Sequence, residues 1–129
     1  MRGRILIVDD SLQVRRSLRW LIEQDLGWEV CGEASNGAEG VSRAAELKPD
    51  IVVLDLSMPV MNGIEAARRL KSMMPQTHLL MLTSFALPDV EEAARSVGID
   101  AFVAKTDGTD SLLESLHRIA APTQISSAD

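Results

Sequence analysis

Four short apolar runs in this chain each end at a polar residue able to bind or transfer a phosphoryl group. The runs are residues 5–8, 51–54, 79–82 and 101–104, and the residues that follow them are Asp9 with Asp10, Asp55, Thr83 and Lys105. If the runs are parallel strands of one sheet, their carboxyl ends meet at one edge, where open α/β sheets bind their ligands. Three carboxylates, a hydroxyl and an ammonium group would then share one site.

Three carboxylates at one edge would repel one another, by roughly 4 kcal/mol per close pair at an effective dielectric constant of about 20. Such a site needs a bound cation. Carboxylate oxygens are suitable ligands for Mg²⁺, and the absence of His and Cys from these motifs argues against zinc. We therefore expect Asp9, Asp10 and Asp55 to form a magnesium site.

Asp55 is the natural nucleophile, because it is the only acid at the end of what is expected to be a central strand. Carboxylates that attack phosphorus form aspartyl phosphates, an established class of covalent intermediate. Lys105 would pair with the phosphoryl group as a point charge, and the Thr83 hydroxyl would hydrogen-bond another phosphoryl oxygen. Each residue alone also fits a turn, a helix cap or a solvated surface, and only the combination of all five indicates a phosphoryl site.

Strands and helices alternate five times along the chain. Continuous apolar strands separated by helices of about ten residues are typical of a parallel sheet that is covered on both faces. Residues 29–34 form a weaker, more polar strand, which is expected at an edge of the sheet. Helices are expected after Ser11, across 36–47, across 64–74, from Pro88 to Gly98 and near 111–120.

The apolar positions of the helices predict which face each one buries. In the helix across 36–47 the predicted buried residues are Ala38, Val41 and Ala45, and in the last helix they are Leu112, Leu116 and Ile119.

The composition, with 46% hydrophobic and 25% charged residues in a chain of 129, is that of a single globular domain. The net charge of −6 does not favour nucleic acid or an anionic membrane, and no apolar run is long enough for a signal peptide or a membrane span. The lone cysteine, Cys31, fits a buried thiol in a reducing compartment. We therefore expect a cytoplasmic protein, with one domain over residues 1–120 and a polar tail or linker stub over 121–129.

The chain resembles the receiver domain of a bacterial two-component response regulator. The resemblance rests on four stretches spread over nearly the whole chain, namely 5–10, 53–63, 82–84 and 102–105. Residues 33–37 and the stretch after Asp55 are similar to receivers of NarL/LuxR-type regulators. The resemblance implies an α/β, flavodoxin-like (CheY-like) fold, with a five-stranded parallel sheet of order 2-1-3-4-5 and helices on both faces.

The resemblance also implies a role for each site residue. Asp55 would accept a phosphoryl group from a sensor histidine kinase. Mg²⁺ would bind Asp10, Asp55 and the main-chain carbonyl of Ser57, while Asp9 would act through a bound water. Thr83, Phe102 and Lys105 would form the switch, in which the threonine hydroxyl moves inward on phosphorylation and the aromatic ring follows it.

The face formed by the fourth helix, fifth strand and fifth helix would change with the switch and select the partner. The same face is the candidate surface for a homodimer. Regulators of this type usually continue into a helix-turn-helix domain that binds DNA. The expected output is therefore transcription, controlled through a domain absent from this chain.

One position departs from the family pattern. Receivers often have a proline after the lysine, with a cis peptide bond, whereas this chain has Thr106. A non-proline cis bond costs about 3 kcal/mol, so we expect a trans bond and a differently shaped loop after Lys105.

Two other functions fit parts of the pattern. Phosphatases of the haloacid dehalogenase type also use an aspartate nucleophile, but they need a second acid two residues later, where this chain has Ser57. A receiver-like interaction module that never takes phosphate would keep the fold, although such modules typically lose an acid or the lysine. We expect a phosphoacceptor whose only catalysis is its own phosphotransfer and dephosphorylation, rather than an enzyme.

Overall fold

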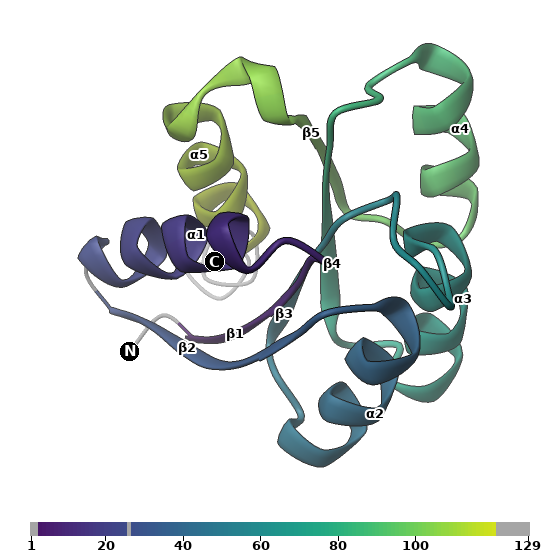
Figure 1. Ribbon diagram of the computed structural model, residues 1–129, viewed down its shortest axis with the longest axis horizontal. Coiled ribbons are helices and arrows are strands. Elements are labelled where there is room, and N and C mark those ends of the chain that lie inside the picture. Colours follow the sequence, from purple (N-terminus) through teal and green to yellow (C-terminus); the bar gives the residue numbers. More distant parts are fainter. Residues whose placement is uncertain (1–2, 26, 121–129) are drawn as a thin grey trace, which may run out of the picture.

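The computed structural model describes residues 3–25 and 27–120, in which strands and helices alternate along the chain (Figure 1). The strands are β1 (Gly3–Val8), β2 (Trp28–Ala34), β3 (Ile51–Leu54), β4 (His78–Thr83) and β5 (Ala101–Ala104). The helices are α1 (Leu12–Gln24), α2 (Gly37–Leu47), α3 (Gly63–Met73), α4 (Pro88–Ser96) and α5 (Thr109–Ala120). The tail predicted for residues 121–129 lies outside the described residues.

The strands form one parallel sheet of order β2-β1-β3-β4-β5, which is the order predicted from the sequence. The most apolar strand, β3, is buried at all its positions and lies at the centre, as expected for a strand covered on both faces. The more polar β2 lies at one edge, also as predicted. Asp55, which follows β3, therefore leaves the sheet at its middle.

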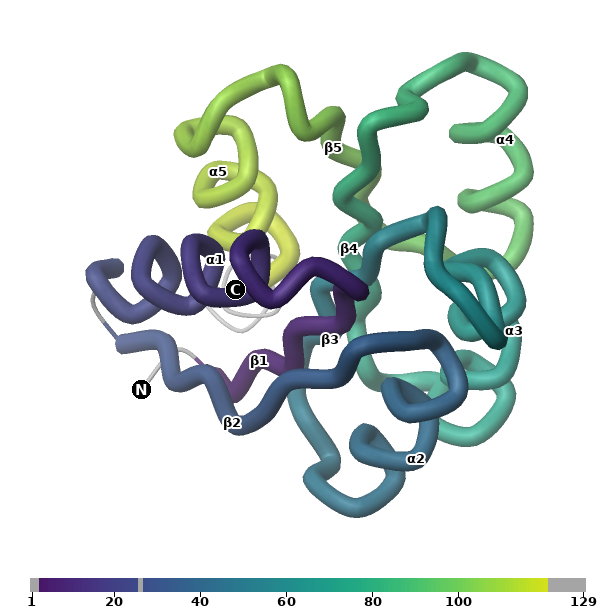
Figure 2. The backbone as a smooth tube through the Cα atoms, viewed as in Figure 1, coloured from purple at the N-terminus to yellow at the C-terminus, as the bar shows by residue number. Residues whose placement is uncertain are grey.

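The helices cover both faces of the sheet, with α1 and α5 on one side and α2, α3 and α4 on the other (Figures 1 and 2). Side chains of each strand alternate between the two sides. In β1, for example, Ile5 and Ile7 pack with α1 and α5, whereas Leu6 and Val8 pack with the other helices. Two apolar cores therefore hold the sheet from both faces, and its carboxyl edge is left for polar residues.

Side-chain caps fix where three of the helices begin. Ser11 Oγ accepts a hydrogen bond from Val14 N at 3.2 Å, and Asn36 Oδ1 accepts one from Glu39 N at 2.8 Å. Both caps were predicted from the sequence. Glu39 in turn accepts a hydrogen bond from the backbone N–H of Ser35, one residue before the cap, and this bond lowers the pKa of the Glu39 carboxyl. Asn62 caps α3 in the same way.

The predicted buried face of α2 was partly wrong. Ala45 is exposed and Ala38 is only half-buried, while Gly40 and Ala44 face the core. Gly40 packs directly against Val8, where an added Cβ would lie 2.9 Å from a Val8 methyl carbon. Glycine has no apolar side chain to show in such a pattern, so the predicted face of α2 lies about one position away from the observed one. In α5 the predicted face is confirmed, although the helix begins two residues earlier than expected, at Thr109.

No helix within residues 3–25 and 27–120 has the length and apolarity needed to cross a bilayer.

Candidate functional site

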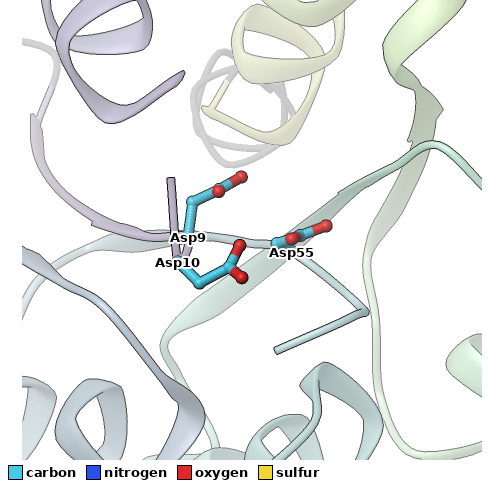
Figure 3. Close-up of side chains that lie close together, drawn as sticks. All are labelled: Asp9, Asp10 and Asp55. Carbon is cyan, nitrogen blue, oxygen red and sulfur yellow. The ribbon is translucent and has the colours of Figure 1, made fainter. Parts of the chain in front are cut away.

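The three acids predicted from the sequence meet at the carboxyl edge of the sheet. Asp9 and Asp10 follow β1, and Asp55 follows β3, its neighbour in the sheet. Each residue places one carboxylate oxygen within 4.8 Å of the others, and the three carboxylates face a common space (Figure 3). Asp9 and Asp55 are buried, with 2% and 5% of their surface exposed, whereas Asp10 is open to solvent. Solvent therefore reaches the cluster from the side of Asp10.

Lys105 brings a positive charge to the two buried acids. Its Nζ lies 3.1 Å from Asp9 Oδ2 and 3.5 Å from Asp55 Oδ1. Lys105 follows β5 and begins a short 3₁₀ turn, Lys105–Asp107. No peptide bond is cis among the described residues, so the Lys105–Thr106 bond is trans, as predicted for a chain without proline there. The trans bond still delivers the ammonium group to the acids.

Burial and charge shift the pKa values at the site. Desolvation raises the pKa of Asp55, and the nearby Asp9 carboxylate raises it further, while Lys105 opposes both effects. Desolvation alone would lower the pKa of Lys105, but attraction to Asp55 and Asp9 outweighs it, so the pKa of the ammonium group is raised. Lys105 therefore stays charged at neutral pH, whereas the site resists a full negative charge on Asp55.

The cluster fits a small divalent cation. Mg²⁺ takes oxygen ligands at about 2.1 Å, so oxygens on opposite sides of the ion lie about 4.2 Å apart. Three carboxylate oxygens within 4.8 Å of one another are near that size and need little movement to contact one ion. The cation would also relieve the repulsion that raises the Asp55 pKa. Ser57, the remaining predicted ligand, lies exposed two residues after Asp55.

Thr83 ends β4, the neighbour of β3 in the sheet, and Phe102 lies within β5, the edge strand beyond it. Thr83 is fully buried at the end of β4, and its Cα is paired with that of Ala104, the residue before Lys105. Its Oγ1 accepts a hydrogen bond from Phe85 N at 3.0 Å. Phe102 is half-buried on β5, where it packs on the same side of the sheet as Met81. The alternation of β4 places Thr83 on that side too. No hydrogen bond links Thr83 to the acids among the described residues.

Arg15, which contacts Asp9, and Glu33, which contacts Arg15, were not predicted as site residues from the sequence. Arg15, on α1, donates from Nη1 to the main-chain oxygen of Asp9 at 2.7 Å. Arg15 Nε also donates to Glu33 Oε1, on β2, at 3.0 Å. The sequence shows that Arg15 lies one helical turn after Ser11. It does not show that Arg15 pairs with Glu33, because that contact depends on how α1 lies over β2.

Comparison with known proteins agrees with this geometry. The family model of the response regulator receiver domain matches residues 5–117. The chain belongs to this family. Its fold is the CheY-like flavodoxin fold of other receiver domains, which was predicted from the sequence and agrees with the observed strand order.

Relatives and solved structures place this receiver domain among response regulators of two-component systems. The response regulator VraR of Staphylococcus aureus is 34% identical over 118 residues, which make up 92% of this chain and 56% of the relative. The chain thus spans about half the length of the curated relatives it matches.

Two solved structures are similar over most of the receiver domain. A LuxR-family two-component response regulator from an Aurantimonas species has 33% identity and a TM-score of 0.89, covering 92% of this chain and 85% of that chain. The response regulator domain of Thermotoga maritima CheB has 34% identity and a TM-score of 0.84, covering 91% of this chain and 94% of that chain.

Proposed function

We propose that this receiver domain accepts a phosphoryl group from the phosphohistidine of a sensor kinase onto the carboxylate of Asp55. The observation that carries the proposal is the convergence of Asp9, Asp10 and Asp55 with the ammonium group of Lys105 at one edge of the sheet. In the transfer, a carboxylate oxygen of Asp55 forms a bond to phosphorus while the phosphorus–nitrogen bond of the donor breaks. The bonding pair remains on the imidazole nitrogen.

The acids would hold Mg²⁺, with Asp10, Asp55 and the Ser57 main-chain carbonyl as ligands and Asp9 acting through a water molecule. When bound, the ion supplies positive charge next to the phosphoryl oxygens and the acids. Asp55 is suited to be the acceptor because it follows the central strand and has the ammonium group of Lys105 3.5 Å from its Oδ1. Lys105 would turn from the two carboxylates to a phosphoryl oxygen, keeping an ionic contact throughout.

The switch would act through Thr83 and Phe102. In this structure the Thr83 hydroxyl accepts a hydrogen bond from the loop at Phe85. A phosphoryl group on Asp55 offers the hydroxyl a stronger, charged acceptor, and movement toward it would release that loop. Because Phe102 packs on the same side of the sheet, its ring can follow into the space that Thr83 leaves. The α4-β5-α5 surface would then favour a different partner or a homodimer.

The output would be the control of transcription through a DNA-binding domain elsewhere in a longer protein. This part of the proposal is supported by LuxR-family regulators among the similar structures and by relatives nearly twice as long as the match. The receiver itself has a net charge of −6, which disfavours direct binding to nucleic acid.

The proposal is tested by the intact mass of the protein after incubation with a small-molecule phosphodonor such as acetyl phosphate. Wild type should gain one phosphoryl group only when Mg²⁺ is present, and Asp55→Asn should gain none. A size-exclusion run of the same samples reports whether phosphorylation changes the oligomeric state. Labelling of Asp55→Asn at the wild-type rate would remove Asp55 as the acceptor. Absence of both labelling and Mg²⁺ binding in wild type would instead favour a receiver-like interaction module that does not depend on phosphorylation.

A further inference from the structure

The two peptide groups that flank Asp9 are each held by a hydrogen bond in this structure. Asp9 N donates to Ala34 O of β2 at 3.0 Å, and Asp9 O accepts from Arg15 Nη1 of α1 at 2.7 Å. The Asp9 side chain is fixed as well, since Oδ1 accepts from Ser11 N at 2.9 Å and Oδ2 from Lys105 Nζ at 3.1 Å. Asp9 is thus held at its backbone and its carboxylate.

Arg15 is itself held in place by Glu33. Glu33 Oε1 accepts from Arg15 Nε at 3.0 Å, while Glu33 Oε2 accepts from Arg19 Nε at 2.9 Å. The Arg15 side chain is only 14% exposed and that of Glu33 is 25% exposed, so solvent competes little for these bonds. Glu33 lies on β2 opposite Ile7, two residues before Asp9. The network therefore joins α1 and β2 to the end of β1.

The hydrogen bond from Arg15 to Asp9 O also affects the position of Asp10. The carbonyl of Asp9 and the N–H of Asp10 belong to one planar peptide group. A guanidinium that holds the carbonyl therefore also holds the N–H and the Cα of Asp10, and restricts the directions in which the Asp10 side chain can leave the backbone. Asp10 is the exposed member of the acid cluster, and within the described residues its carboxylate makes no hydrogen bond that would orient it. Its direction depends mainly on the backbone.

We infer that Arg15 is a positioning residue for the divalent cation site, and that Glu33 acts through it. The inference rests on the proposed function, because it assigns Arg15 a role in placing Asp10 for Mg²⁺. Groups that orient metal ligands without touching the metal typically change affinity by about 10-fold or more when they are removed.

Charge alone predicts the opposite sign for Arg15. Removing a guanidinium near three carboxylates would make the site more negative, and Mg²⁺ would bind more tightly. Loss of positioning would make Mg²⁺ bind more weakly. The two effects of Arg15→Met therefore point in different directions, and the sign of the change decides between them.

The experiment compares Mg²⁺ dissociation constants by isothermal titration calorimetry for wild type, Arg15→Met, Arg15→Lys and Glu33→Ala. Arg15→Met should raise the constant about 10-fold. Arg15→Lys should also weaken binding, because a single ammonium group cannot donate in the two fixed directions that reach Asp9 O and Glu33 together. The double variant Arg15→Met/Glu33→Ala should bind no more weakly than Arg15→Met, since Glu33 acts through Arg15.

Arg16→Met is the matched control, because Arg16 is the exposed neighbour on the same helix. It should bind Mg²⁺ like wild type. Urea unfolding of every variant separates a loss of stability from a loss of affinity, which is measured on folded protein. At saturating Mg²⁺ the rate of phosphorylation by acetyl phosphate should return to near the wild-type rate in Arg15→Met, as expected when only cation binding is impaired.

Unchanged or tighter Mg²⁺ binding by Arg15→Met would overturn the inference, as would wild-type binding by Arg15→Lys. If wild type binds Mg²⁺ and takes phosphate while the variants match it, this inference alone fails. If wild type neither binds Mg²⁺ nor takes phosphate, the proposed function fails and the inference falls with it.

Discussion

Lys105 Nζ lies 3.5 Å from Oδ1 of Asp55, at the point where the central strand of the sheet ends. The same ammonium group lies 3.1 Å from Asp9 Oδ2. A single cation thus bridges two buried carboxylates that would otherwise repel each other. Lys105 therefore balances the charge of the two acids, and under the proposed function it would also bind the phosphoryl group on Asp55.

Replacing Lys105 with methionine keeps much of its volume and removes the charge. Because the ammonium group would otherwise stabilise negative charge on the phosphoryl group, we expect phosphorylation of Lys105→Met by acetyl phosphate to slow by about 100-fold. The rate is measured from intact mass over time at saturating Mg²⁺. Lys105→Arg, which keeps the charge, should lose less. Equal rates for Lys105→Met and wild type would mean that the lysine has no part in the transfer.

Asp55→Asn should stabilise the fold in buffer free of divalent cations. The pKa of Asp55 is raised in the folded state, first by desolvation and then by Asp9. The folded protein therefore favours the protonated carboxyl, and it loses stability as the pH rises above the ordinary Asp pKa of 3.8 and through the folded pKa. Asparagine carries no charge to desolvate. At pH 7 we expect Asp55→Asn to have a higher melting temperature than wild type. The difference should be about 4 °C for each kcal/mol of desolvation and repulsion that the substitution removes.

Mg²⁺ provides the control for this prediction. The ion should stabilise wild type and narrow the difference from Asp55→Asn, since a ligand that binds only the folded state raises its stability. The comparison is made by thermal unfolding across pH 4–8. A wild type that is more stable than Asp55→Asn in chelator at pH 7 would contradict the assigned cause of the pKa shift.

Most of the sheet and the meeting of Asp9, Asp10, Asp55 and Lys105 were predictable from the sequence, because continuous apolar runs followed by Asp or Lys mark buried parallel strands and their carboxyl ends. Contacts between elements far apart in the sequence were harder to predict. The hydrogen bond from Arg15 to Asp9 O depends on how α1 crosses the sheet, and the buried Gly40 gives no apolar signal. The resemblance to receivers suggested that Thr83 is part of the switch. The hydrogen bond from Phe85 N to Thr83 Oγ1 was not predictable, because it depends on how the loop after β4 folds.

Gly63→Ala should damage both the fold and the site. A Cβ at Gly63 would overlap the main-chain oxygen of Asp55 and lie 2.8 Å from Leu56 Cα, and these backbone atoms cannot turn away as a side chain can. We expect a loss of about 3 kcal/mol in the free energy of unfolding, together with slower phosphorylation. Gly40→Ala is the comparison, because its Cβ would meet only the side chain of Val8. Urea unfolding should rank Gly63→Ala as the less stable of the two variants.

Val60→Asn should stabilise the loop after Asp55. Val60 has φ +68°, a left-handed conformation that costs a β-branched residue roughly 1–2 kcal/mol. Its side chain is 84% exposed, so little apolar contact would be lost. Asparagine adopts this conformation more readily, and we expect a gain of about 1 kcal/mol in the free energy of unfolding by urea. Val60→Ala, which keeps a Cβ but is not suited to positive φ, should gain less. A less stable Asn variant would show that Val60 is not strained.

The most direct test of the central claim asks which of the three clustered acids becomes phosphorylated. After treatment with acetyl phosphate and Mg²⁺, borohydride reduces an aspartyl phosphate to homoserine, and peptide mass spectrometry locates the altered residue. The proposed function predicts homoserine at position 55, dependent on Mg²⁺ and absent when the phosphodonor is omitted. Reduction at Asp9 or Asp10 with residue 55 unchanged, or no reduction at any acid, would contradict it.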